Sequence, residues 1–191
     1  MKKLVFGISG ASGAPYAKRL LEHFRSTPDA PHVELVLSRT AEQVWSHECG
    51  GNPRDLGFSV YEGRDYAAPF ASGSARYDGM LVLPASMSSI ARIAHGVSDD
   101  LLTRAADVML KERKALVVVP REAPYSAIHL ENMLSITRAG AVVLPASPSF
   151  YGRPASLNDA MDTVLARVLD HLGIEHSLAR RWGQEVKLGR D

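Results

Sequence analysis

The sequence predicts an α/β fold in which a mostly parallel sheet carries helices on both faces, in three layers. Two observations predict it. Short apolar runs that end at glycine, proline or serine alternate along the chain with segments whose apolar residues recur at helical spacing. The length of 191 residues suits one such domain, and 46% hydrophobic with 23% charged residues is typical of a folded chain. We therefore expect residues 1–191 to form a single domain.

The expected strands are apolar runs of the length that buried parallel strands have. In order along the chain, they are residues 4–9, 33–38, 58–61, 79–84, 115–120 and 141–145. The third is the least regular, because residues 49–78 around it are rich in glycine and proline. The other five are bounded by clear turn residues, so they define the sheet.

The expected helices follow the strands and carry apolar residues at helical spacing. In order, they are residues 14–24, about 40–48, 86–95, 101–113, 128–137 and 156–172. Asp99 and Asp100 precede the fourth helix, where carboxylates stabilise the positive end of the helix dipole. Ser156, with Asp159 three residues later, indicates a variant capping box at the start of the last helix.

Charge and composition exclude several classes of function. A formal net charge of +1 gives no general attraction to nucleic acid or to a membrane surface. No run approaches the roughly 18 apolar residues of a membrane span, and the apolar run near the start is too short for a signal peptide. Cys49 is the one cysteine and the histidines lack metal-ligand spacing, so we expect no disulfide and no metal. We expect a cytoplasmic protein without a nucleic-acid or membrane partner.

Small, hydroxyl-bearing turns follow three of the expected strands and lead into the next segment. They are residues 9–13, 84–89 and 145–147. In an open parallel sheet, ligands bind in the crevice outside the carboxyl ends of the strands. Glycine and serine let the backbone approach an anion there, and a helix start supplies N–H groups. These turns predict a ligand that bears phosphate, although the first turn taken alone also fits a tight connection without a ligand.

The spacing within the first turn narrows the ligand without choosing it. Gly7, Gly10 and Gly13, in and just before this turn, lie three and three residues apart. The dinucleotide fingerprint needs spacings of two and three, and the Walker A loop needs Gly-Lys-Ser/Thr. Ser12 lies in Gly-Ala-Ser-Gly and so lacks the spacing of a hydrolase elbow. NAD, ATP and a serine nucleophile are therefore disfavoured.

Charged residues near the crevice form a second group of candidates. Arg104 and Lys111 lie seven residues apart on one expected helix, near one of its faces. Arg121 and Glu122 directly follow an apolar strand, a position that points into the crevice. For Lys111 and for Glu48, the usual alternative to a functional role is a solvent-exposed position at a helix end.

A series of short motifs runs along the chain: GISGASGA at 7–14, ASGS at 71–74, LTRAADV at 102–108, LKER at 110–113, VPREAP at 119–124, HLENM at 129–133, GAVVLP at 140–145, Phe150-Tyr151 and RWG at 181–183. In the order and spacing of these motifs, the chain resembles the UbiX family of flavin prenyltransferases. The resemblance spans nearly the whole chain and implies a Rossmann-like (flavodoxin-like) fold. It also implies transfer of a dimethylallyl group from dimethylallyl monophosphate to N5 and C6 of reduced FMN, without a metal. The product, prenylated FMN, would serve a UbiD-type decarboxylase, and the chain would form a homododecamer with sites at subunit interfaces.

The resemblance also assigns roles to individual residues. Those that would hold FMN are Gly10, Ala11, Ser12, Ser38, Ser86, Met87, Ser88, Ser89 and Arg104. Those that would hold the donor phosphate or wall its pocket are Lys111, Arg121, Glu122, Tyr151, Arg167 and Trp182. Ser12 and Glu48 would manage protons, and Lys111 and Glu122 join them as catalytic candidates.

One turn departs from the family pattern. Many members have cysteine at the position of Ala85, and Lys-Thr or Gly-Thr at the positions of Ser88 and Ser89. This departure bears on the detailed FMN contacts. Two other functions stay open: an FMN-dependent cysteine decarboxylase-like flavoprotein, whose corresponding turn carries an asparagine that is lacking here, and a non-catalytic module that stores flavin. The storage module would need the phosphate-binding turns but not the set Lys111, Arg121, Glu122 and Tyr151.

Overall fold

The structure, a computed structural model, describes residues 2–179. By their contacts the residues group into two compact units, Met1–Ala146 and Ser147–Asp191. The first unit holds the whole sheet, and the expectation of a single domain stays a prediction. Within the described residues, none of the helices is both long and apolar enough to cross a membrane.

The sheet has six parallel strands in the order β3-β2-β1-β4-β5-β6. Their bounds are β1 Lys3–Ile8, β2 His32–Leu37, β3 Ser59–Tyr61, β4 Gly79–Ala85, β5 Ala115–Pro120 and β6 Val142–Val143. Every residue of β4 is buried and so is all of β1 except Lys3, because both strands lie in the middle of the sheet under helices on each face. All six expected strands are present.

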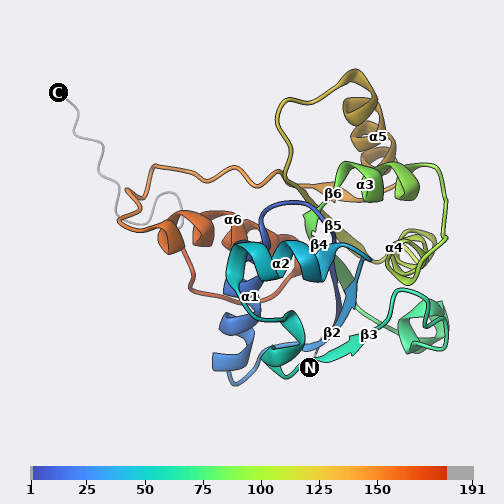
Figure 1. Ribbon diagram of the computed structural model, residues 1–191, viewed down its shortest axis with the longest axis horizontal. Coiled ribbons are helices and arrows are strands. Elements are labelled where there is room, and N and C mark those ends of the chain that lie inside the picture. The colour runs from blue at the N-terminus through green and yellow to red at the C-terminus, as the bar shows by residue number, and fades with distance from the viewer. Residues whose placement is uncertain (1, 180–191) are drawn as a thin grey trace. The chain divides into compact units, whose positions relative to one another are not determined.

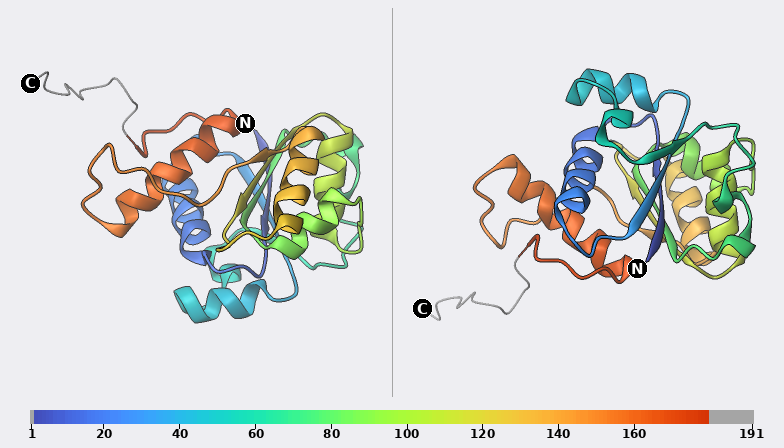
Figure 2. Two further views of the ribbon diagram at one scale, coloured as in Figure 1. Left: turned by 90° about the horizontal axis from the view of Figure 1, so that it is seen from above. Right: turned by 90° about the horizontal axis from the view of Figure 1, so that it is seen from below.

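The first unit places its helices on both faces of the sheet, as expected. These helices are α1 Ala14–Ser26, α2 Ala41–Cys49, α3 Met87–Ala94, α4 Leu101–Lys111 and α5 Ala127–Arg138. Figures 1 and 2 show α1 on one face and α3, α4 and α5 on the other. Short 3-10 turns at Pro53–Leu56, Pro69–Ala71 and Gly73–Ala75 fill the long connection around β3.

The second unit contributes one long helix, α6, Leu157–Leu172. The capping box predicted for it is confirmed: the Ser156 hydroxyl accepts the N–H of Asp159, and the Asp159 carboxylate accepts the N–H of Ser156. Asp100 likewise caps α4, as the sequence indicates.

The last strand is shorter than expected. Residues 141–145 were predicted to form it, and the structure has only Val142–Val143. This strand lies at the edge of the sheet and pairs with β5 alone, so one neighbour defines it. The chain continues alongside β5 through bonds from Leu144 N–H to the Val118 carbonyl, 2.9 Å, and from Ala146 N–H to the Pro120 carbonyl, 3.1 Å.

Candidate functional site

The turn after β1 is closed by a carboxylate from a distant helix. Gly13 begins α1 with a positive φ of 117°, a conformation that favours glycine, and no side chain of the turn caps the helix. Glu48, near the end of α2, supplies the cap: its Oε2 accepts the N–H of Gly13 at 2.8 Å and that of Ala14 at 2.9 Å. The Ser12 hydroxyl also bonds to Glu48. Two N–H groups at the start of α1 are therefore already paired with an anion of the chain itself.

Glu48 is held in its ionised form by these contacts. Burial alone would raise its pKa, but the hydrogen bonds from Ser12, Gly13 and Ala14 and the charge of Arg121 outweigh burial and lower the pKa below its ordinary value. At neutral pH the carboxylate is thus an acceptor that orients the Ser12 hydroxyl.

Arg121 joins this group from the end of β5. Its Nε donates to the Ser12 carbonyl at 3.1 Å, across 109 residues of sequence. Glu122 beside it accepts the N–H of Ala123 at 3.1 Å. The structure therefore brings Ser12, Glu48 and Arg121 together at the carboxyl edge of the sheet, where the sequence predicted a crevice.

An open cavity of about 390 Å³ lies beside Ser12 and Glu48. Gln43, Val44 and His47 of α2 line the rest of it. None of these three was predicted as a site residue. The signal that could have found them is helical spacing, because Val44 lies one turn before Glu48 and Gln43 one turn before His47.

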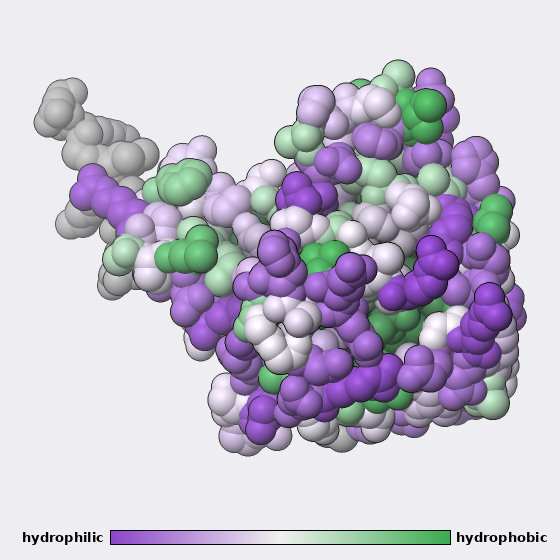
Figure 3. All heavy atoms as spheres, in the orientation of Figure 1, coloured by the Kyte–Doolittle hydropathy of each residue, from purple (hydrophilic) through white to green (hydrophobic). Residues whose placement is uncertain are grey.

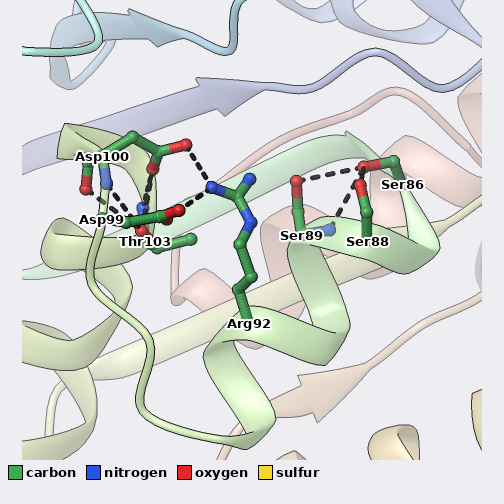
Figure 4. A network of polar contacts seen from close by, with 7 residues as sticks. All are labelled: Ser86, Ser88, Ser89, Arg92, Asp99, Asp100 and Thr103. Atoms are coloured by element: carbon green, nitrogen blue, oxygen red, sulfur yellow. Dashed lines mark hydrogen bonds and ion pairs between the residues drawn. The ribbon is translucent and has the colours of Figure 1, made fainter.

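The turn after β4 forms a cluster of hydroxyl groups at the start of α3. The Ser86 hydroxyl caps the helix by accepting the N–H of Ser89 at 3.3 Å, and it lies 3.1 Å from the Ser88 Oγ and 3.0 Å from the Ser89 Oγ (Figure 4). Buried Ser9, a further residue not predicted as a site residue, ties this turn to the first. Its hydroxyl donates to the Pro84 carbonyl at 2.8 Å and accepts the Ser86 N–H at 2.6 Å.

One feature of this edge fits a bound polar ligand, and a second brings two of its turns close together. The Ser38 Oγ is buried and has no hydrogen-bond partner among residues 2–179, which is costly unless a ligand group satisfies it. Gly10 lets the first turn approach the connection after β2, since a Cβ there would lie 1.9 Å from the Thr40 Oγ1.

Arg104 and Lys111 lie elsewhere in the first unit. Arg104 Nε donates to the Ala71 carbonyl at 3.1 Å, and its Nη1 pairs with Asp107 at 2.9 Å. Lys111 is the last residue of α4 and pairs with Glu112. Strand β5 begins at Ala115, three residues after Glu112. Because strands begin at the amino edge of the sheet, Lys111 lies at the edge opposite Ser12 and Glu48. One chain does not gather all of its expected site residues.

Three expected residues belong to the second unit or beyond. Tyr151 is 73% exposed. Arg167 lies on α6 with a side chain that is 61% exposed and paired with Asp170 at 2.8 Å. Trp182 falls outside the described residues.

Comparison with known proteins decides the family. The flavoprotein family model matches residues 1–169. The flavin prenyltransferase UbiX of Methanocaldococcus jannaschii is 43% identical over 184 residues, which cover 95% of this chain and 98% of that protein. The UbiX of Thermoplasma acidophilum is 45% identical, over 94% of this chain and 99% of that protein. The chain belongs to the UbiX flavin prenyltransferases.

Solved structures of UbiX relatives match the fold closely. AnUbiX in complex with FMN and dimethylallyl pyrophosphate superposes with a TM-score of 0.90 at 42% identity, over 95% of this chain and 97% of that one. A dodecameric FMN-dependent UbiX-like decarboxylase from Escherichia coli O157:H7 gives 0.89 at 45% identity, over 94% and 98%. The cysteine decarboxylase SpaF gives 0.59 at 18% identity, which shows a shared fold alone. For this UbiX-family chain, the predicted flavodoxin-like α/β architecture is confirmed.

Proposed function

We propose that this UbiX-family chain is a flavin prenyltransferase that joins the dimethylallyl group of dimethylallyl monophosphate to N5 and C6 of reduced FMN. The product, prenylated FMN, would be the cofactor of a UbiD-type decarboxylase. The observation that carries the proposal is the close structural match to AnUbiX, a relative that binds FMN together with a dimethylallyl donor. Reduced FMN supplies the nucleophilic N5 and C6.

The residues of the carboxyl edge fit the flavin. Glu48 already caps α1, so the start of α3 is the helix start that we assign to the FMN phosphate, with Ser86, Met87, Ser88 and Ser89 around it. Gly10, Ala11 and Ser12 would lie along the flavin. The unpaired hydroxyl of Ser38 supports a polar contact from the ligand.

The donor needs cations around its departing phosphate. When the bond between the dimethylallyl carbon and the phosphate oxygen breaks, negative charge grows on the phosphate, and preorganised cations and hydroxyls stabilise it. Arg121 stands at the carboxyl edge beside Ser12. From the family resemblance, the other candidates for holding the donor are Glu122, Tyr151, Arg167 and Trp182.

After N5 has taken the dimethylallyl group and the phosphate has left, the remaining alkene needs a proton at its middle carbon to make the tertiary carbon electrophilic. C6 then bonds to that carbon and gives up its own proton to an acceptor. We assign that task to Ser12 and Glu48, with the hydroxyl accepting the proton as it passes its own to the carboxylate. The lowered pKa of Glu48 makes it a weak base, so the contribution of the pair lies in its fixed orientation as much as in basicity.

Lys111 would come from a second copy. Its place at the end of α4, at the amino edge of the sheet, separates it from Ser12 of the same chain, so the full residue set needs a neighbour. The dodecameric relative supports a homo-oligomer, and we propose a dodecamer here. Helix α5 also exposes Ile128, Leu130 and Leu134, apolar side chains of the kind that subunits cover; hydrophobic atoms over α5 are visible in Figure 3.

One incubation tests the function. The protein is mixed with reduced FMN and dimethylallyl monophosphate, with the diphosphate in a parallel arm, and the flavin is examined by mass spectrometry. A mass gain of one prenyl unit is expected. Tight binding of unchanged FMN would instead indicate storage, and oxidative decarboxylation of a peptide with a C-terminal cysteine would indicate the decarboxylase function.

We also propose a cytoplasmic location and a single functional domain over residues 1–191. The family model, which matches residues 1–169, supports the single domain. Cell fractionation and limited proteolysis test them respectively.

A further inference from the structure

Arg92 of α3 binds two carboxylates at the start of α4. Its Nη1 donates to Asp99 Oδ1 at 2.7 Å and to Asp100 Oδ2 at 2.6 Å. Figure 4 shows the arginine leaving α3 and reaching across to the segment that begins α4. The side chains of Arg92 and Asp100 are only 27% and 22% exposed, whereas Asp99 is 60% exposed. The contact of Arg92 with Asp100 is therefore better shielded from solvent than its contact with Asp99.

Asp100 also caps α4. Its Oδ1 accepts the N–H of buried Thr103 at 2.8 Å and the Thr103 hydroxyl at 2.8 Å. Burial would raise the pKa of Asp100, but the bonds from Thr103 and Arg92 outweigh it and lower the pKa. One carboxylate thus fixes the first turn of α4 and holds the side chain that comes from α3.

These two helices carry different parts of the proposed site. Ser88 and Ser89, at the start of α3, lie one turn before Arg92 on the same helix. Arg104 follows the Asp100 cap directly on α4. The connection between the helices, residues 95–100, includes Gly96 with a positive φ of 67° and exposed Val97. The ion pair therefore adds a polar link, on the outer side, between two helices whose buried faces share one hydrophobic core.

We propose that Arg92 is a positioning residue of the FMN phosphate site, holding the start of α3 in place through Asp100 without touching the flavin. The inference rests on the proposed function, since it takes α3 as the phosphate-binding helix. Amide and hydroxyl groups bind phosphate well only when their positions are fixed in advance. Loss of the ion pair should therefore weaken FMN binding and leave the chemical step unchanged.

The test compares Arg92→Met with Arg92→Lys and with Arg54→Met. Arg54 is a matched control, because it also bridges two carboxylates, Glu42 at 2.6 Å and Glu62 at 2.8 Å, but makes no contact with α3. The FMN Kd is measured by fluorescence titration, and kcat and the donor KM at saturating FMN. For Arg92→Met we expect the FMN Kd to rise about fivefold to tenfold with kcat and donor KM unchanged.

The control and the conservative variant define the remaining outcomes. Arg92→Lys should recover part of the affinity, and Arg54→Met should keep the Kd within about twofold, because exposed pairs contribute little. An FMN Kd for Arg92→Met equal to that of Arg54→Met overturns the inference, and so does a fall in kcat at unchanged Kd.

Asp100→Asn gives an independent check if Arg92→Met does not fold. Asparagine is as good a helix cap as aspartate, so this variant keeps the start of α4 and loses only the charge that holds Arg92. It should raise the FMN Kd as Arg92→Met does, and the double variant should be no weaker than either single one. If the losses of FMN affinity in the two single variants add up in the double variant, the inference is contradicted. Wild-type protein that binds FMN without prenylating it overturns the proposed function and leaves the Arg92 test intact; protein that binds no FMN overturns both.

Discussion

Glu48 shapes the carboxyl edge because one carboxylate serves three groups of the turn after β1. It caps α1 through Gly13 and Ala14 and orients the hydroxyl of Ser12. An anion that is bound so firmly by the chain itself has two consequences. The start of α1 is closed to a second anion, and the stability of the turn depends on the charge of Glu48.

The stability contributed by Glu48 should disappear in acid. Its folded pKa lies below the ordinary value of 4.5, so the contribution is complete above that pH and is lost as the pH falls through the folded pKa. Glu48→Gln removes the charge, and we expect a loss of about 1 kcal/mol at pH 7. The difference from wild type should shrink below pH 4.5. Urea unfolding at fixed protein concentration measures it, with exposed Glu22→Gln as the control; a difference that persists unchanged at pH 3.5 would contradict the assignment.

The rate of prenylation should depend on both members of the proposed proton path. Ser12→Ala removes the hydroxyl and Glu48→Gln removes the acceptor, and each should slow formation of prenylated FMN by about 100-fold. Binding of FMN should change much less than the rate. Single-turnover reactions followed by mass spectrometry give the rate. If both variants form the product as fast as the wild type, Ser12 and Glu48 carry no proton.

At the scale of elements, Ser9 connects the two central strands where their loops begin. β1 and β4 pair directly in the sheet, and the Ser9 hydroxyl extends that pairing to Pro84 near the end of β4 and to Ser86 just after it. The first turn and the start of α3 thereby hold a fixed separation, which a ligand spanning both would require.

Ser9→Ala should therefore lower both stability and FMN affinity. The half-buried N–H of Ser86 would lose its acceptor, at a cost of about 1 kcal/mol. Thermal unfolding and FMN titration measure the two effects, and Ser46→Ala, on an exposed position of α2, is the matched control. Loss of stability with unchanged FMN affinity would show that Ser9 has a structural role alone.

The elements could be predicted from the sequence where local signals and burial agree. The central strands are continuous apolar runs because both of their faces are covered. Asp100 and Ser156 indicate helix starts because their side chains accept hydrogen bonds from the first turn. β6 was predicted too long because an edge strand has hydrogen-bond partners from a neighbouring strand on one side only. Ser9 was not singled out because its role is a contact across 77 residues, which no local pattern reports.

At the scale of the whole molecule, the candidate site was predicted only in part. Turns after the strands indicated a phosphate-binding crevice, since parallel topology places every such turn at one edge. The pairing of Ser12 with Glu48 came from the family resemblance, because spacing alone does not bring α2 against the first turn. Topology separates Lys111 from this crevice. It places the end of α4 at the amino edge of the sheet, so a complete site requires more than one copy of the chain.

Mixing two inactive variants tests this division of the site between copies. Glu48→Gln damages the carboxyl edge of its own chain, and Lys111→Met damages the residue that the chain would supply to a neighbour. Co-expressed in equal amounts, the two should form mixed oligomers in which about one quarter of the sites are intact. Each site takes Glu48 from one chain and Lys111 from a neighbour, and each of these has an even chance of being unaltered. Prenylated FMN should therefore reappear at about a quarter of the wild-type rate.

A second mixture serves as the control for this recovery. Ser12 and Glu48 lie on the same side of a site in one chain, so a mixture of Ser12→Ala with Glu48→Gln leaves every site with one defect and should recover nothing. Size-exclusion chromatography and differently tagged copies establish that both mixtures co-assemble. If the Glu48→Gln and Lys111→Met mixture stays inactive although it co-assembles, the site does not combine residues of two chains. Lys111 would then act only as the partner of Glu112 at the end of α4.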